Sequence, residues 1–193
     1  MPNPSRDIIN DQEQGLAVES TYSFDLLVDQ YKNMVYSIAF RMVGNRDDAL
    51  EVSQDAFMQV HKNLSRFKGE SRISTWVYRI AYNEALMHLR KRKQQPLEIE
   101  YGGEAVSFTN VSLAIENLSQ EERKRYISVA LAHLSGSEST ALTLYYLEEQ
   151  TIEEVALIMD ISEANVKVKL FRARAKFHVV MMQLLNVEIM NLL

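Results

Sequence analysis

The sequence predicts an all-α protein made of two small helical domains joined by a linker. Glycine and proline are scarce, with 6 and 3 occurrences in 193 residues, so few chain breaks are marked. Apolar residues recur at three- and four-residue steps over most of the chain, whereas the strand signals are weak. Residues 94–118 lack this periodicity and carry Pro96 and a Gly102–Gly103 pair, which is typical of a linker.

The first domain is expected at residues 21–94, after a loosely ordered tail at residues 1–20. It should contain three or four helices packed as a bundle. The periodicity predicts helices from Phe24 to Met42, from about Asp47 to Arg66, and from Ser74 or Thr75 into the basic run at residues 90–93. The stretch "GNRDD" and Gly69 separate them.

The second domain is expected at residues 119–193, after the linker at 95–118. Its helix starts are marked by Ser or Thr followed three residues later by Glu, the pattern of a capping box. These signals are Ser119 with Glu122, Ser135 with Glu138 and Thr151 with Glu154. A last helix should start near Glu163 and continue to the end of the chain.

Composition limits the classes of function. The chain has no cysteine, which excludes disulfides, thiolate metal sites and thiol catalysis. The polar N-terminus has no apolar core of a signal peptide, and no run approaches about 18 apolar residues, so a cytoplasmic protein is expected. The four histidines show no metal-ligand spacing, and no Gly-rich phosphate loop or serine elbow is present. We therefore expect no enzyme, no cofactor, no metal and no small-molecule substrate.

The charges are segregated along a chain whose formal net charge is -5. Residues 61–93 and 161–193 are basic, whereas residues 1–60 and 94–160 are acidic. An evenly mixed solvated surface would seldom separate charge so far. The pattern indicates partners of both signs.

The last two predicted helices form a helix-turn-helix candidate. Ile152, Val155 and Met159 make one apolar stripe, Val166 and Leu170 belong to the next, and a short turn joins them. Any helical hairpin could show this geometry, but basic and amide side chains flank the stripe of the last helix. These are Asn165, Lys167, Lys169, Arg172, Arg174 and Lys176. Such a helix suits a DNA groove, although its crest carries the apolar Val168 and Phe171.

The helix after Gly69 combines cations, a ring and an amide on one predicted face. Arg79, Tyr82, Asn83 and Arg90 lie opposite the apolar side that holds Trp76. An unstacked base can stack on an aromatic ring for about 1–3 kcal/mol while cations hold its phosphates. The face therefore suits single-stranded nucleic acid, although simple packing of Tyr82 and Trp76 is the alternative.

Two blocks resemble the extracytoplasmic-function (ECF) sigma factors of bacterial RNA polymerase. The loop "FKGES" and the run "TWVYRIAYN" resemble the second conserved region of that family, and "TIEEVALIMDISEANVKVKLFRARAKF" resembles its fourth region. The resemblance implies a factor that binds core RNA polymerase, brings it to promoter DNA and assists melting. It also implies an anti-sigma factor as a partner, often anchored in a membrane.

The resemblance implies a role for each surface. The second helix, where an acidic row could equally be a solvated face, would dock on the polymerase through Asp48, Glu51, Gln54 and Asp55. The minus-ten element would be bound by Phe67, Lys68, Gly69, Glu70, Ser71, Arg79, Tyr82, Asn83 and Arg90. The minus-thirty-five element would be read by Asn165, Lys167, Lys169, Arg172, Arg174 and Lys176.

Departures from the family pattern and two rival interpretations remain. The usual Gly-Thr and Ser-Arg of the recognition helix are here Ala164-Asn165 and Val168-Lys169, which affects the promoter sequence more than binding itself. The long apolar end could cover the interface between the two domains. The rivals are a stand-alone helix-turn-helix transcriptional regulator and a helical protein-binding adaptor.

Overall fold

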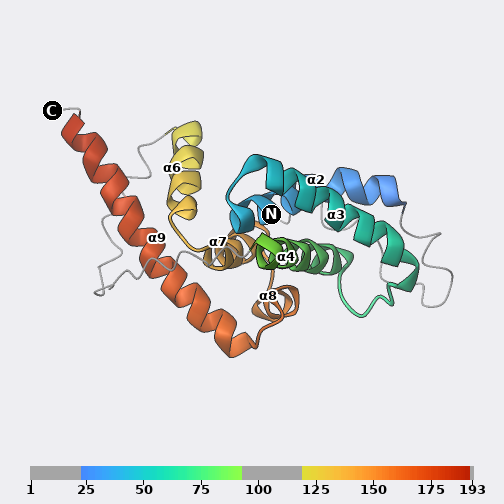
Figure 1. Ribbon diagram of the computed structural model, residues 1–193. Coiled ribbons are helices and arrows are strands. Elements are labelled where there is room, and N and C mark those ends of the chain that lie inside the picture. Colours follow the sequence, from blue (N-terminus) through green and yellow to red (C-terminus); the bar gives the residue numbers. More distant parts are fainter. Residues whose placement is uncertain (1–22, 93–118, 192–193) are drawn as a thin grey trace.

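The computed structural model describes residues 23–92 and 119–191, and all regular elements in these ranges are helical. This confirms the predicted all-α fold (Figure 1). The first unit comprises α2 (Phe24–Val43), α3 (Arg46–Asn63), the short η1 (Leu64–Arg66) and α4 (Ile73–Arg92). The second comprises α6 (Gln120–Ala132), α7 (Gly136–Leu142), η2 (Thr143–Leu147), α8 (Ile152–Met159) and α9 (Glu163–Asn191). The predicted tail at 1–20 and linker at 95–118 lie outside the described residues.

Local sequence signals explain the helices of the first unit. Gly44 ends α2 in the left-handed conformation, with φ of 78°, which glycine adopts without steric cost. Asn45 then caps α3, since its side-chain oxygen accepts a hydrogen bond from the backbone N–H of Asp48 at 2.9 Å. The three helices bury small and branched residues between them, among them Ile38, Val60 and Val77. Interlocking of these side chains fixes the bundle on which α4 is displayed.

The second unit begins its helices at the three predicted capping boxes. Both reciprocal hydrogen bonds of the box are present in α6 at Ser119, in α7 at Ser135 and in α8 at Thr151. The predicted start of the last helix at Glu163 is also confirmed. Because each box satisfies backbone N–H groups that the first turn leaves without partners, the helix starts could be read locally.

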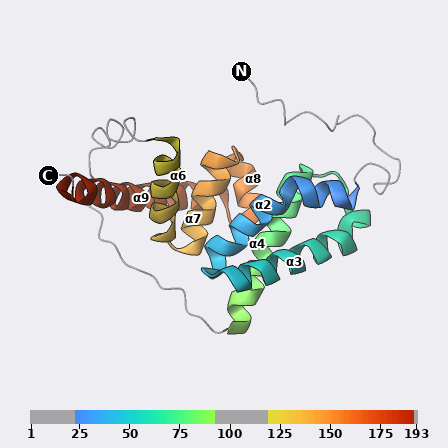
Figure 2. The same cartoon turned by 90° about the horizontal axis from the view of Figure 1, so that it is seen from above.

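The two units pack closely against each other. Helix α4 lies against α8, and α2 lies against α7, so α4 is enclosed between its own bundle and the second unit (Figures 1 and 2). One continuous apolar core contains buried residues from both units. The apolar end of the chain was expected to cover this interface, but its described residues Val180, Met181 and Leu185 pack with Ala130 of α6 instead.

Candidate nucleic-acid interfaces

The loop before α4 presents polar groups on an aromatic anchor. The Phe67 ring is buried and lies 5.2 Å from the Trp76 ring, centroid to centroid. Lys68, Gly69 and Glu70 are exposed, and Gly69 has a φ of 72°, a conformation that disfavours any side chain. The loop is therefore fixed at its base and open at its tip, while Phe67 serves as a support and not as an exposed contact.

Helix α4 extends this surface with two exposed arginines and an exposed asparagine. Arg79, Asn83 and Arg90 are exposed, as predicted. Tyr82 is not: its side chain is 5% exposed, and burial raises the pKa of its phenol. Tyr82 lies on the same helical stripe as Thr75, Tyr78 and Arg79, whose side chains contact the second unit. A helical wheel of α4 alone could not include α8, so the prediction of an exposed ring is wrong for this arrangement.

Helix α3 presents a shorter acidic face than predicted. Glu51, Gln54 and Asp55 are exposed. Asp48 instead accepts a hydrogen bond from Asn45 Nδ2 at 2.6 Å and forms an ion pair with Arg92 of α4. Its side chain is only 15% exposed. Asp48 therefore joins α3 to the end of α4 and is not available as a free docking group here.

A groove between α2 and α3 lies beside this acidic face, and sequence reasoning missed it. Its volume is about 740 Å³. The lining is largely apolar and includes Tyr36, Leu50, Phe57 and Met58, together with Gln54. Leu50 and Met58 are 44% and 54% exposed, which is unusual for large apolar side chains. The only sequence signal for the groove was the position of Leu50 and Met58, each about one helical turn from Gln54 in the row on α3.

The helix-turn-helix geometry is present in α8, the turn and α9. Asp160 ends α8 in the left-handed conformation with φ of 55°. The Ser162 hydroxyl accepts a hydrogen bond from the backbone N–H of Asn165, which starts α9. Val155 and Ile158 of α8 pack in the same core as Val166 and Leu170 of α9. These contacts hold the outer face of α9 toward solvent.

The basic and amide residues of α9 that were predicted to contact DNA divide into two groups. Asn165, Lys167, Arg172 and Arg174 are exposed, with Arg174 donating a hydrogen bond to the Tyr146 hydroxyl at 3.2 Å. On the crest between them, Val168 and Phe171 are 48% and 68% exposed. The outer face is thus cationic at its flanks and apolar along its centre, and both kinds of group can contact a major groove.

Lys169 and Lys176 face α7 instead of open solvent. Lys169 donates to the Ser137 hydroxyl at 3.1 Å, and Lys176 forms an ion pair with the buried Glu138 at 2.9 Å. Burial alone would raise the pKa of Glu138, but hydrogen bonds from Lys176 and Ser135 outweigh it and lower the pKa. The prediction that Lys176 is a DNA contact conflicts with this structural role, because sequence periodicity could not show that α7 packs on this flank.

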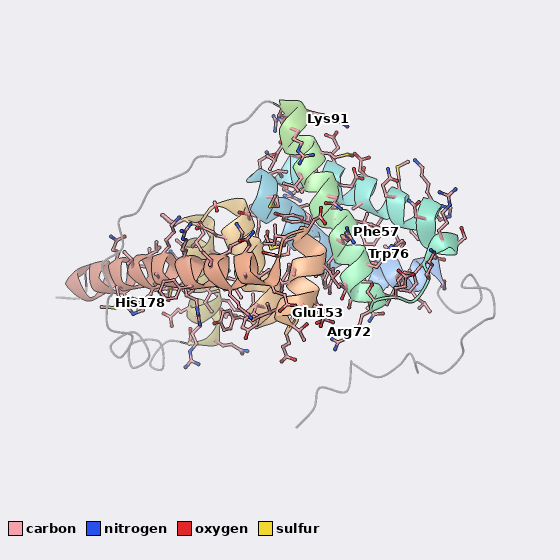
Figure 3. All side chains as sticks on the ribbon, turned by 90° about the horizontal axis from the view of Figure 1, so that it is seen from below. Phe57, Arg72, Trp76, Lys91, Glu153 and His178 are labelled. Atoms are coloured by element: carbon pink, nitrogen blue, oxygen red, sulfur yellow. The ribbon has the colours of Figure 1, made fainter. Side chains whose placement is uncertain are left out.

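The second unit places carboxylates next to α4, which sequence reasoning did not anticipate. Figure 3 shows Arg72 at the start of α4 beside α8, where Glu153 is labelled, and Lys91 at the opposite end of α4. Arg72 forms an ion pair with Glu154 at 3.1 Å.

Within the described ranges, no cluster of three or more metal-ligating side chains is found, and no helix is long and apolar enough to cross a bilayer.

These surfaces define a class: a two-unit helical protein with a helix-turn-helix and a second, loop-and-helix surface for nucleic acid. Comparison with known proteins identifies the family. The family model for Sigma-70 region 2 matches residues 27–95, and the model for Sigma-70, region 4, matches residues 124–177. The chain belongs to the ECF sigma factors of RNA polymerase. This confirms the predicted family and the prediction of a transcription-initiation factor that is not an enzyme.

Individual relatives support this assignment. The chain is 31% identical over 159 residues to the RNA polymerase sigma-H factor of Pseudomonas aeruginosa, covering 79% of this chain and 82% of that protein. It is 30% identical to the ECF RNA polymerase sigma factor SigW of Bacillus subtilis, covering 79% and 85%.

Solved structures share the fold at lower identity. The sigma factor RpoE of Bartonella quintana, in complex with the anti-sigma factor NepR, gives a TM-score of 0.57 at 16% identity over 82% of this chain and 96% of that chain. CnrH, in complex with the cytosolic domain of CnrY, gives 0.56 at 19% identity over 83% and 88%.

Proposed function

We propose that this chain is a cytoplasmic sigma factor that binds core RNA polymerase, directs it to promoters and assists melting of the minus-ten element. Three surfaces support the proposal, each on a different element. The exposed face of α9 with Asn165, Lys167 and Arg172 suits duplex DNA, and the loop at Lys68 with Arg79 and Asn83 of α4 suits an opened strand. Side chains on α3 suit a protein partner.

The polymerase surface is proposed on α3 and the groove beside it. Glu51, Gln54 and Asp55 supply exposed polar groups, and Leu50 and Met58 supply an adjoining apolar contact. Protein interfaces combine an apolar centre with a polar rim, which this arrangement provides. We include an anti-sigma factor as a partner, because the similar RpoE structure is a complex with one.

The observation that carries the proposal is the exposure of Arg79 and Asn83, one turn apart on α4, the helix that follows the open loop at Gly69. Opening a base pair costs stacking and pairing energy, and groups that bind only the opened strand offset part of that cost. Such groups favour melting without strengthening duplex binding. A duplex-binding regulator has no need of this surface.

The test is co-purification with core polymerase, followed by run-off transcription on genomic fragments, which also identifies a promoter. On that promoter, Asn83→Ala should reduce the open complex by about fivefold, the equivalent of one hydrogen bond of about 1 kcal/mol. Binding of the duplex minus-thirty-five fragment should not change.

Gln30→Ala, which removes an exposed amide from the outside of α2, is the matched control and should leave the open complex unchanged. Failure of the wild-type chain to bind core polymerase would refute the function. Equal losses on duplex and open DNA with Asn83→Ala would refute the role of α4.

A further inference from the structure

The outer face of α9 carries a stripe of side chains that can neither donate nor accept a hydrogen bond. Its members are Ala164, Val168, Phe171 and Ala175. They follow one another at steps of four, three and four residues, which places them on one line along the helix. Because Val166 and Leu170 are buried on the opposite side of α9, this apolar stripe faces away from the core of the second unit.

The two large members of the apolar stripe are well exposed. The exposed fractions of Val168 and Phe171 are 48% and 68%. A single exposed apolar side chain is common on protein surfaces and needs no explanation. Here two such side chains are neighbours on one helix face, and an alanine continues the stripe at each end. Contiguous exposed apolar surface of this kind is a feature of interaction sites.

The charges beside the apolar stripe indicate duplex DNA as its partner. Lys167 and Arg172 are exposed cations that flank Val168 and Phe171, and residues 164–187 contain no acidic residue. Cations at the flanks of a helix can bind phosphates along a groove, which fixes the position of the helix but carries no sequence information. Recognition of the bases is therefore left to the side chains between them.

Only one feature of a base edge in the major groove is apolar. Ring nitrogens, carbonyl oxygens and amino groups all require a hydrogen-bonding partner, whereas the C5-methyl group of thymine requires an apolar one. A side chain of the apolar stripe can therefore reward only a methyl group. Val168 suits this task because a β-branched side chain in a helix has one strongly preferred rotamer, so that its methyl groups are already in place.

We propose that Val168 and Phe171 determine promoter specificity by recognising C5-methyl groups of pyrimidines in the minus-thirty-five element. The proposal rests on the proposed function of α9 and adds the chemical group that is recognised. The element should carry a thymine under each of the two side chains. Since neither side chain can sense the group at position 4 of a pyrimidine, 5-methylcytosine should be preferred to cytosine there, just as thymine is preferred to uracil.

The test separates the methyl group from the other features of the base. A fluorescent duplex carries the minus-thirty-five element of the promoter found by run-off transcription. At each thymine in turn, thymine is compared with uracil opposite adenine, and 5-methylcytosine with cytosine opposite guanine, so that each pair differs only in the methyl group. Anisotropy at fixed salt gives the affinity of the full chain. At two positions the methyl group should raise the affinity about fourfold in both pairs, the effect of burying one such group.

Substitutions in the apolar stripe assign each methyl group to a side chain. Val168→Ala should abolish the methyl dependence at one position, and Phe171→Ala should abolish it at the other. Both substitutions shorten an exposed side chain to the best helix former, so the fold should not suffer. Leu26→Ala on α2 is the matched control, because Leu26 is 67% exposed, close to Phe171. It should leave both methyl effects unchanged.

Equal affinity for thymine and uracil at every position, in a chain whose binding still depends on Arg172, overturns the proposal and leaves the proposed function intact. A methyl effect that survives both substitutions also overturns it, since the methyl group then acts through the shape of the DNA. If Val168→Ala weakens binding to core polymerase but not to DNA, the stripe is a protein contact and the proposal is wrong. If the unsubstituted chain binds no duplex, the proposed role of α9 fails together with it.

Discussion

The two helices proposed to bind DNA, α4 and α9, differ in how far the rest of the protein covers them. The outer face of α9 is open, with Asn165, Lys167 and Arg172 exposed. The corresponding face of α4 is partly covered, since Arg79 pairs with Asp160 and Tyr82 is buried. Both helices carry cations, so composition does not explain the difference. It arises from which neighbour packs on the helix.

This difference fits the two tasks. Duplex DNA exists before the polymerase arrives, and an open α9 can contact it at any time. An opened strand exists only during initiation, so a surface for it can be covered until then. The comparison implies that substitutions in α9 should act on the isolated chain, whereas those on the covered face of α4 should act through the polymerase complex.

The largest expected effect is on the free energy of unfolding. It distinguishes Lys176, which has a structural role, from the residues of α9 that are proposed to bind DNA. Lys176→Met leaves the buried Glu138 without its charged partner and should lower the free energy of unfolding by about 3 kcal/mol at neutral pH. Since the pKa of Glu138 is lowered in the folded chain, the stability from this pair is present above the ordinary carboxyl pKa and is lost as pH falls through the lowered value. The loss should therefore shrink in acid, as measured by urea denaturation at several pH values.

Arg174→Met, two residues along, is the control and should cost much less, because Arg174 is exposed. Equal losses for the two variants would contradict the structural role of Lys176.

The sequence was sufficient for the helices, because their signals are local. The starts of α6, α7 and α8 follow from Ser119, Ser135 and Thr151, each with a glutamate three residues later. The predicted bounds of α2 and α4 also lie within two residues of those observed, since Gly44 ends α2 and the basic run at residues 90–93 marks the end of α4. The family followed from the motif around Gly69 and α4.

The site residues that were misjudged depend on contacts between distant segments. Tyr82 is buried in the core that the two units share, and Lys176 is paired because α7 packs on α9. Asp48 is tied to Arg92 across the bundle. A helical wheel separates one side of a helix from the other, but it does not say how many neighbours that helix has. The close approach of Gly136, the first residue of α7, to the main chain of Arg41 and Met42 in α2 has no sequence signal. Glycine occurs at helix starts without any tertiary reason.

A smaller effect should test the open face of α9. Arg172→Ala should weaken binding of a duplex minus-thirty-five fragment by about tenfold, within the 1–3 kcal/mol expected for a base-contacting arginine. Because Arg172 is exposed while the two units are packed together, the isolated chain should already show this loss of DNA affinity. Fluorescence anisotropy with labelled duplex measures it at fixed salt, and the free energy of unfolding should not change.

Arg125→Ala on α6 removes another exposed arginine, which lies outside the helix-turn-helix. The same tenfold loss with this control would mean that α9 contributes only general charge.

The smallest effect concerns α4 and its contact with α3. Burial raises the pKa of Glu84, and the nearby Asp55 carboxylate raises it further, so the ionised side chain is disfavoured in the folded protein. Glu84→Gln should therefore raise the urea midpoint slightly at neutral pH. The gain should vanish as pH falls below the ordinary carboxyl pKa, because Glu84 is then protonated in both the folded and the unfolded chain. Glu51→Gln, on the exposed face of α3, should show no such pH-dependent gain, and a gain of equal size there would trace the effect to net charge instead of the α3–α4 contact.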